Sequence, residues 1–156
     1  MSKDTKKVIE LLNAGRAREL SAILQYMAQH YELANDDFGK LAKILKTTAI
    51  VEMKHAEVLA ERILFLGGVP TSKPDGVTAK GEKIVDKIAT DIKLEQEAIA
   101  MYNESAVACA ELLDNVSKAI FEKLLADEND HLDMFQNIKE HIDQLGDVYL
   151  ATLTGE

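Results

Sequence analysis

Apolar residues recur along most of the chain at the three- and four-residue spacing of helices that bury one face. The segment without this periodicity, residues 67–80, contains both prolines and three glycines and is expected to be a linker. Gly15 lies inside the first periodic run, where a glycine weakens a helix. The pattern predicts long helices over about residues 4–34, 37–66, 81–113 and 115–145, and a short fifth helix over about 147–153.

The lengths of the connections predict the topology. The breaks between the first two long helices and between the last two are only a few residues, so each pair should form an antiparallel hairpin. A helix of about 28 residues is roughly 42 Å long, and an extended linker of about fourteen residues reaches about 46 Å. An up-down-up-down bundle would need a much shorter linker. We therefore expect two hairpins joined by one long crossover, with the second and third helices parallel.

Composition narrows the class of protein. The 156 residues, 47% of them apolar, suffice for one domain over 1–156. A net charge of -9 argues against nucleic acid as a partner and favours a surface that attracts cations. Cys109 is the single cysteine, which excludes an intrachain disulfide, a zinc finger and a four-cysteine iron site. No apolar run resembles a signal peptide or a membrane span, so we expect a soluble cytoplasmic protein.

One pattern of side chains occurs twice in the chain. It consists of a Glu, a Tyr seven residues later, and a Glu-x-x-His pair that begins 33 residues after the first Glu. Residues three apart share a helix face, so the Glu and His of each pair can bind one metal ion. The two copies are Glu19, Tyr26, Glu52 and His55, and Glu95, Tyr102, Glu128 and His131.

The four glutamates lie near the midpoints of the four predicted long helices, so they can meet at one level of the core. Four buried carboxylates would be very unfavourable without a cation. Two divalent metals would balance their charge, and oxygen and imidazole ligands with open coordination positions suit iron or manganese better than structural zinc. We expect Glu52 and Glu128 to bridge the two metals, with Glu19 and His55 completing one site and Glu95 and His131 the other.

Other readings of these residues stay open. The same charges would be compatible with a solvated surface on a helical module that binds no metal. Tyr26 and Tyr102 would suit core packing, or one of them, for which we favour Tyr26, would donate an electron during oxygen reduction. Asp91 and Asp127 would accept the outer N–H of a ligand histidine or be exposed to solvent.

At these positions the sequence resembles a bacterioferritin, a member of the ferritin-like di-iron family. The likeness covers nearly the whole chain and includes Gln25-Tyr26, the run Glu52–Ala56, the stretch Glu61–Leu66, and Asp127-Glu128 with His131. It implies an all-α ferritin-like four-helix bundle with a short fifth helix, and a di-iron centre held at the six Glu and His positions. It also implies ferroxidase activity: Fe(II) is oxidised by dioxygen or peroxide and stored as ferric mineral in a hollow 24-subunit shell built from dimers.

The resemblance gives Met53 a second role. On a helix its side chain points about 100° away from that of Glu52, toward a flank of the bundle. By itself that position favours packing. The resemblance implies instead that Met53 and its mate from a second subunit are the axial ligands of a shared haem b. Thr47 and Val51 depart from the family, because many bacterioferritins have a His and an Asp there as an accessory iron site.

A second function class fits the same ligands. A stand-alone di-iron or di-manganese oxidase or peroxidase, similar to rubrerythrin or manganese catalase, would use this centre without storing mineral. The missing four-cysteine iron site argues against a full rubrerythrin, and the chain is short for a manganese catalase. If the chain stores iron, a ferredoxin-type reductant is the partner expected for iron release.

Overall fold

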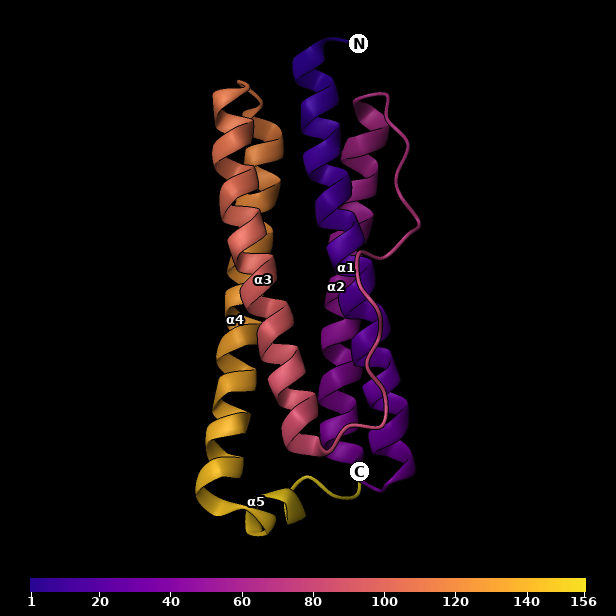
Figure 1. Ribbon diagram of the computed structural model, residues 1–156, viewed down its shortest axis with the longest axis vertical. Coiled ribbons are helices and arrows are strands. Elements are labelled where there is room, and N and C mark those ends of the chain that lie inside the picture. Colours follow the sequence, from indigo (N-terminus) through magenta and orange to yellow (C-terminus); the bar gives the residue numbers. More distant parts are fainter.

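The computed structural model describes residues 1–156 and contains helices and no strands (Figure 1). This confirms the predicted all-α class. The helices are α1 (Lys3–Asn35), α2 (Gly39–Phe65), α3 (Ile84–Glu111), α4 (Asn115–Leu145) and the short α5 (Asp147–Ala151).

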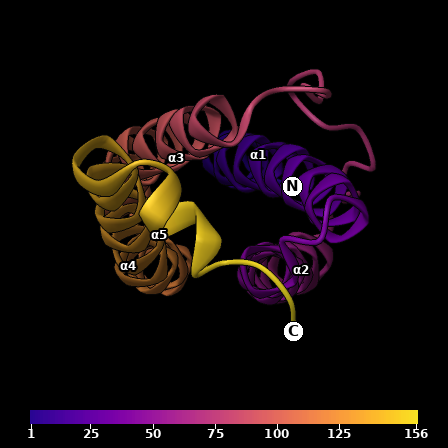
Figure 2. The same ribbon diagram turned by 90° about the horizontal axis from the view of Figure 1, so that it is seen from below.

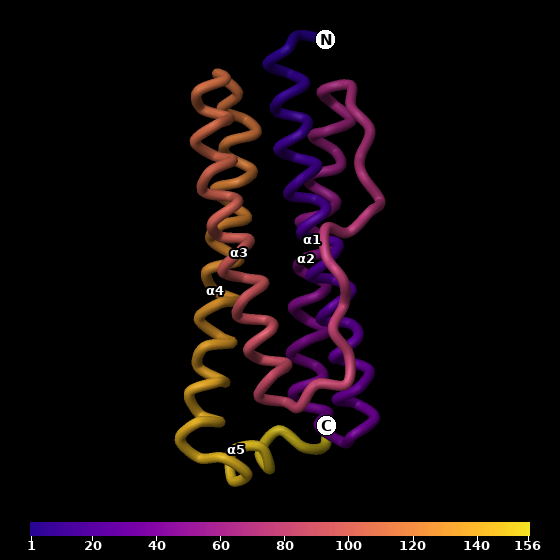
Figure 3. Tube along the Cα trace, in the orientation of Figure 1, coloured from indigo at the N-terminus to yellow at the C-terminus, as the bar shows by residue number.

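The four long helices form a bundle of two antiparallel hairpins, α1 with α2 and α3 with α4 (Figure 1). The segment between α2 and α3 runs back along the length of the bundle beside α1, as the trace in Figure 3 shows. Helices α2 and α3 are therefore parallel, as the connection lengths predicted. Seen from below, α5 lies across the end of the bundle, and α1 faces α3 while α2 faces α4 (Figure 2). None of the helices is both long and apolar enough to span a membrane.

Several helix boundaries differ from the prediction by one to three residues. Helix α2 begins at Gly39 instead of residue 37, and its N-cap, Phe38, makes no side-chain hydrogen bond. The C-terminal segment binds this turn instead, because the N–H of Gly155 donates to Asp37 O at 2.9 Å. Helix α3 begins at Ile84, three residues later than predicted, because Gly81 has a positive φ of 72° and the N-cap Lys83 is extended. Helix α5 ends at Ala151, two residues earlier than predicted.

Side chains of α1 fasten the long crossover to the bundle. Arg16 Nε donates to Thr71 O at 2.8 Å, and the Ser21 hydroxyl donates to Asp75 at 2.5 Å. The amide of Gln25 pairs with the backbone of Ala79 in both directions, at 2.9 Å each. These contacts satisfy polar groups of a segment that has no regular structure of its own.

The core consists of two apolar clusters separated by a polar layer. One cluster, which includes Leu33, Leu45 and Phe135, lies toward the end that α5 covers. The other, which includes Leu12, Ile63 and Phe121, lies toward the opposite end. On each of the four long helices the residues of one cluster precede the predicted glutamate and those of the other follow it, so the polar layer lies at mid-bundle.

Candidate metal centre

The polar layer brings together the six Glu and His side chains that the sequence singled out. Each long helix contributes one glutamate, and α2 and α4 each add a histidine one turn later, as the Glu-x-x-His spacing requires. All four glutamates are at most 1% exposed. The side chains of His55 and His131 are 6% and 12% exposed. The centre is thus shielded from bulk water.

Two overlapping groups of side chains are each close enough to hold one metal ion. The first is Glu19, Glu52, His55 and Glu128, and the second is Glu52, Glu95, Glu128 and His131. Within each group the donor atoms lie within 4.8 Å of one another. Glu52 and Glu128 belong to both groups, which is the arrangement expected of carboxylates that bridge two ions.

Both histidines direct Nδ1 to the middle of the cluster. His55 Nδ1 lies 3.1 Å from Glu128 Oε1 and 3.3 Å from Glu52 Oε2. His131 Nδ1 lies 2.7 Å from Glu52 Oε1 and 3.5 Å from Glu95 Oε1. The two rings are 6.4 Å apart and nearly parallel, with 29° between their planes. This placement is consistent with one imidazole on each side of a pair of ions.

The electrostatics of the cluster favour a cation. Burial raises the pKa of Glu95 to about 8 and that of Glu128 to about 7, and repulsion between neighbouring glutamates adds to both shifts. Burial also raises the pKa of Glu19, with Glu52 as the next cause. Buried ligand atoms without a hydrogen-bond partner include both oxygens of Glu52 and Nδ1 of each histidine. Metal coordination would satisfy these oxygen and nitrogen donors, so the residues fit a pair of divalent ions.

Burial lowers the pKa of each histidine, but close contact with the surrounding carboxylates outweighs this effect and raises the net value. In the metal-free cluster the two imidazoles therefore act as the cations that balance the glutamates. A bound metal would replace their protons, because a ligating imidazole must be neutral at the coordinating nitrogen.

The two tyrosines of the repeat hydrogen-bond to candidate ligands across the seam between α1 and α3. Tyr26 donates to Glu95 Oε1 and Tyr102 donates to Glu19 Oε1, both at 2.5 Å. Tyr26 on α1 thus orients Glu95 on α3, and Tyr102 on α3 orients Glu19 on α1. Both rings are fully buried, so each tyrosine packs in the core and also supports a ligand of the site. The role of Tyr26 as an electron donor stays a prediction.

The two aspartates differ in position. Asp127 accepts a hydrogen bond of 2.8 Å from Nε2 of His55, so it orients the histidine of the opposite hairpin. Asp91 is fully buried, has no histidine partner, and neither of its carboxylate oxygens is hydrogen-bonded. Both readings of its position, an acceptor for a ligand histidine and a residue exposed to solvent, are therefore wrong.

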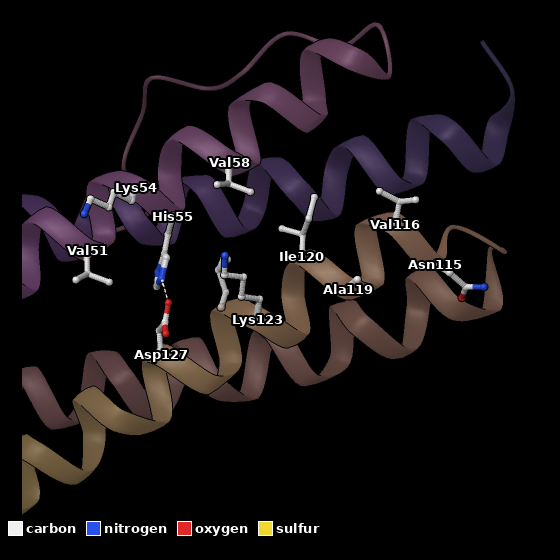
Figure 4. Close-up of a pocket in the computed structure, with 11 residues that line it drawn as sticks. Val51, Lys54, His55, Val58, Asn115, Val116, Ala119, Ile120, Lys123 and Asp127 are labelled. Atoms are coloured by element: carbon white, nitrogen blue, oxygen red, sulfur yellow. Dashed lines mark hydrogen bonds and ion pairs between the residues drawn. The ribbon is translucent and has the colours of Figure 1, made fainter.

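A groove of about 680 Å³ between α2 and α4 leads to the His55–Asp127 pair (Figure 4). Its lining is mostly apolar, but Lys54 and Lys123 also border it. Val51, one of the two departures noted in the sequence, is part of this lining. Thr47 is exposed on the same helix, and Met53 is 41% exposed and belongs to neither metal group.

The sequence pattern did not single out a set of buried polar residues that lies next to the centre. Gln29 and Lys87 are 1% and 5% exposed, and they lie on α1 and α3 beside Asp91. The sequence contains a signal for part of this set, because Lys87, Asp91 and Glu95 follow one another at four-residue spacing.

Comparison with known proteins identifies a family for this arrangement. Residues 9–145 match the model of a ferritin-like domain. The chain is 44% identical to a bacterioferritin of Desulfovibrio desulfuricans over 96% of this chain and 83% of that protein. It is 38% identical to a bacterioferritin of Brucella melitensis over 93% of this chain and 90% of that protein.

Solved structures agree with the sequence comparison. The crystal structure of Desulfovibrio desulfuricans bacterioferritin, which describes its di-iron site in different catalytic states, has a TM-score of 0.96 at 43% identity over 98% of this chain and 90% of that one. The structure of Rhodobacter capsulatus bacterioferritin has a TM-score of 0.92 at 38% identity over 97% of this chain and 94% of that one. That structure is described with a metal-free dinuclear site and a haem iron.

Proposed function

Because this chain belongs to the bacterioferritin family of ferritin-like proteins, we propose that it is an iron-storage ferroxidase. It oxidises Fe(II) with dioxygen or peroxide and stores the ferric product as mineral inside an oligomeric shell. One observation about this chain's own residues supports this assignment. Two groups of four donor side chains share Glu52 and Glu128, so the bundle can hold two iron ions side by side.

Each side chain has a distinct part in holding the substrate iron. Glu19 and His55 bind one Fe(II), Glu95 and His131 bind the other, and Glu52 and Glu128 bridge them. Two adjacent Fe(II) ions supply two electrons to one molecule of oxidant, which is the chemistry the pair contributes. The protein's contribution is to neutralise four buried carboxylates with the ions and to exclude bulk water from the reaction.

Residues around the ligands hold them in position. The hydrogen bond to Asp127 keeps the proton of His55 on Nε2, so Nδ1 is free to coordinate. Hydrogen bonds from Tyr26 and Tyr102 hold one oxygen of Glu95 and of Glu19, which leaves Oε2 of each glutamate for metal. Tyr26 is in addition our candidate for an electron donor, since its hydroxyl contacts a ligand directly.

A haem b shared between two subunits belongs to the same proposal. The thioether of Met53 lies on the flank of α2, is 41% exposed, and takes no part in the metal groups. It is therefore free to ligate haem iron opposite the same residue of a second copy. The expected observation is a haem absorption band in protein expressed with haem available, and its loss in Met53→Leu. A band that survives this substitution would contradict the assignment.

The assembly, location and partners complete the proposal. The shell is a 24-mer built from dimers, and it is located in the cytoplasm, where a reducing environment keeps iron ferrous. A ferredoxin-type protein supplies the electrons that release stored iron. Thr47 and Val51 cannot replace the His and Asp of the family's accessory site, so iron reaches the cavity without that site in this chain.

Iron loading of the metal-free protein tests the function. We expect two Fe(II) per subunit to bind without oxygen, and many more to accumulate as mineral once oxidant is added, in a particle whose native mass is that of a large shell. The double variant His55→Ala/His131→Ala should lose rapid oxidation. His141→Ala is the matched control, because His141 is exposed and lies outside the centre.

The alternative of a stand-alone oxidase or peroxidase makes a different prediction. It requires a small oligomer that turns over peroxide and stops at two metal ions per subunit. That outcome, or metal content unchanged in the double variant, would overturn the storage function.

A further inference from the structure

A line of polar side chains, all buried except Glu32 at its outer end, follows the seam between α1 and α3 from the metal centre toward the end of the bundle where α3 begins. The surrounding core at this level is the apolar cluster that includes Leu33 and Ile88. Polar groups in such a place cost free energy unless they are paired or have a function. The line consists of Tyr26, Gln29 and Glu32 on α1 and of Glu95, Asp91 and Lys87 on α3.

The other half of the bundle has no such line. Glu19 and Glu95 are 76 residues apart, and the same offset relates both tyrosines and both Glu-x-x-His pairs. Applied to Asp91 and Lys87, it gives Gly15 and Leu11, and applied to Gln29 it gives Ser105. Because the ligands and their tyrosines recur without the line, it is not needed to hold the ligands.

Asp91 is the member of the line whose carboxylate is least compensated by neighbouring groups. It is 0% exposed, and neither carboxylate oxygen has a hydrogen-bond partner. The ammonium of Lys87 binds other acceptors, Glu32 Oε2 at 2.9 Å and Glu82 O at 2.7 Å. Burial raises the pKa of Asp91 well above its usual range, and Glu95 and Glu82 add to the rise against the opposing effects of Gln29 and Lys87. A carboxyl in this environment is most stable as the neutral acid, which holds a transferable proton.

The two ends of the line connect the centre with solvent. At the inner end Tyr26 hydrogen-bonds to Glu95 at 2.5 Å. At the outer end Glu32 pairs with Lys87, accepts the N–H of Gly81 at 2.9 Å, and has a side chain that is 28% exposed. Between the two ends, the side-chain amide oxygen of Gln29, Oε1, is a buried acceptor without a hydrogen-bond partner. Unpaired buried acceptors of this kind suit a protonated carboxyl or a bridging water.

We propose that this line, with Asp91 as its proton carrier, conducts protons between solvent and the metal centre, an inference that rests on the proposed ferroxidase function. The reaction requires them, because two Fe(II), one hydrogen peroxide and two protons give two Fe(III) and two water molecules. Each Fe(II) loses one electron, the O–O bond breaks, and a proton completes each water. Asp91 delivers a proton toward Tyr26 and Glu95, and is reprotonated from the Glu32 end.

The Asp91→Asn variant tests this route, because it keeps the size of the side chain and removes the transferable proton. We expect it to bind two Co(II) per subunit like the unmodified protein, so that the centre is intact. Oxidation of Fe(II) by peroxide should slow by roughly 10²-fold, as for loss of a positioned acid. The solvent deuterium isotope effect should increase, because proton arrival then limits the rate. Asp91→Glu should recover part of the rate.

Ser105→Ala is the matched control, since Ser105 is 3% exposed and occupies the position related to Gln29 by the internal repeat. Its rate and isotope effect should equal those of the unmodified protein. If Asp91→Asn oxidises iron as fast as that protein, or slows without a change in isotope effect, the relay is wrong while the ferroxidase assignment stands. If the unmodified protein itself does not oxidise iron, the proposed function fails.

A spectroscopic measurement tests the proton on Asp91 without turnover. In the Zn(II)-loaded protein the ligand glutamates are ionised, so the infrared carbonyl stretch of a buried carboxylic acid should come from Asp91. We expect this band to shift in D₂O and to disappear in Asp91→Asn while Ser105→Ala retains it. Its absence from the unmodified protein, or its persistence in Asp91→Asn, would overturn the assignment of Asp91 as the carrier.

Discussion

Tyr102 on α3 donates a hydrogen bond of 2.5 Å to Oε1 of Glu19 on α1. The same hydroxyl lies 3.3 Å from the carbonyl oxygen of Gly15, one helical turn before Glu19. Both side chains are at most 1% exposed. A hydrogen bond from a neutral hydroxyl to a buried carboxylate stabilises the ionised form, which is the form that binds metal. Tyr102 therefore supports one half of the proposed di-iron centre.

Tyr102→Phe should weaken one of the two metal sites. Removal of the hydroxyl leaves Oε1 of Glu19 buried without its donor, and loss of such support lowers metal affinity by roughly 10-fold to 100-fold. Co(II) titration of the metal-free protein should show one weakened and one unchanged site per subunit. Tyr31→Phe is the control, because Tyr31 is 64% exposed. Two unchanged sites would show that the hydrogen bond does not support Glu19.

Gly15→Ala should destabilise the protein, although alanine is the better helix former by about 1 kcal/mol. A Cβ at this position would lie 3.2 Å from Cε1 of Phe121 and 3.3 Å from Cε1 of Tyr102. Both rings are fully buried, and crowding of a packed core costs about 1–3 kcal/mol. We expect a net loss of about 1 kcal/mol in urea unfolding of the metal-free protein. A gain in stability would mean that Tyr102 and Phe121 are free to move aside.

Asp127→Ala should weaken the site that includes His55. The change removes the acceptor of the 2.8 Å hydrogen bond from Nε2, so the ring loses its preferred tautomer and orientation. Metal affinity at this site should fall by roughly 10-fold to 100-fold in Co(II) titrations. Asp130→Ala is the matched control, since Asp130 is an exposed aspartate of the same helix that lies outside both metal groups. Equal affinities of the two variants would rule out an orienting role for Asp127.

Metal binding to the metal-free protein should release protons and strengthen with pH. Burial raises the pKa of Glu95 to about 8 and of Glu128 to about 7, so both carboxyls are largely protonated at about pH 6 and must ionise to bind. Affinity for Co(II) should therefore increase from about pH 6 to about pH 8, and the protons that His55 and His131 lose on coordination add to this increase. Calorimetry in buffers of different ionisation enthalpy measures the protons released. An affinity that does not change over this range would contradict the raised pKa values.

Much of this protein follows from the one-dimensional pattern. Apolar periodicity determines the helices, and the length of the crossover determines that α2 and α3 are parallel. The two Glu-x-x-His pairs, together with Glu19 and Glu95, place six donors at mid-bundle. These features depend on helix geometry and chain length, which are local properties. Apolar periodicity does not predict the start of α3 correctly. The helix begins only at Ile84, because Gly81 has a positive φ that interrupts the helical conformation.

The tertiary structure decided which side chains meet across helices. Helical spacing assigns Tyr102, Asp127 and Asp91 to a face, but it does not say that Tyr102 contacts Glu19, that Asp127 contacts the histidine of the other hairpin, or that Asp91 is left without a partner. These outcomes depend on the rotation and offset of one helix against the next. Interlocking of side chains along the full length of the bundle sets both, and no single segment of the sequence contains that information.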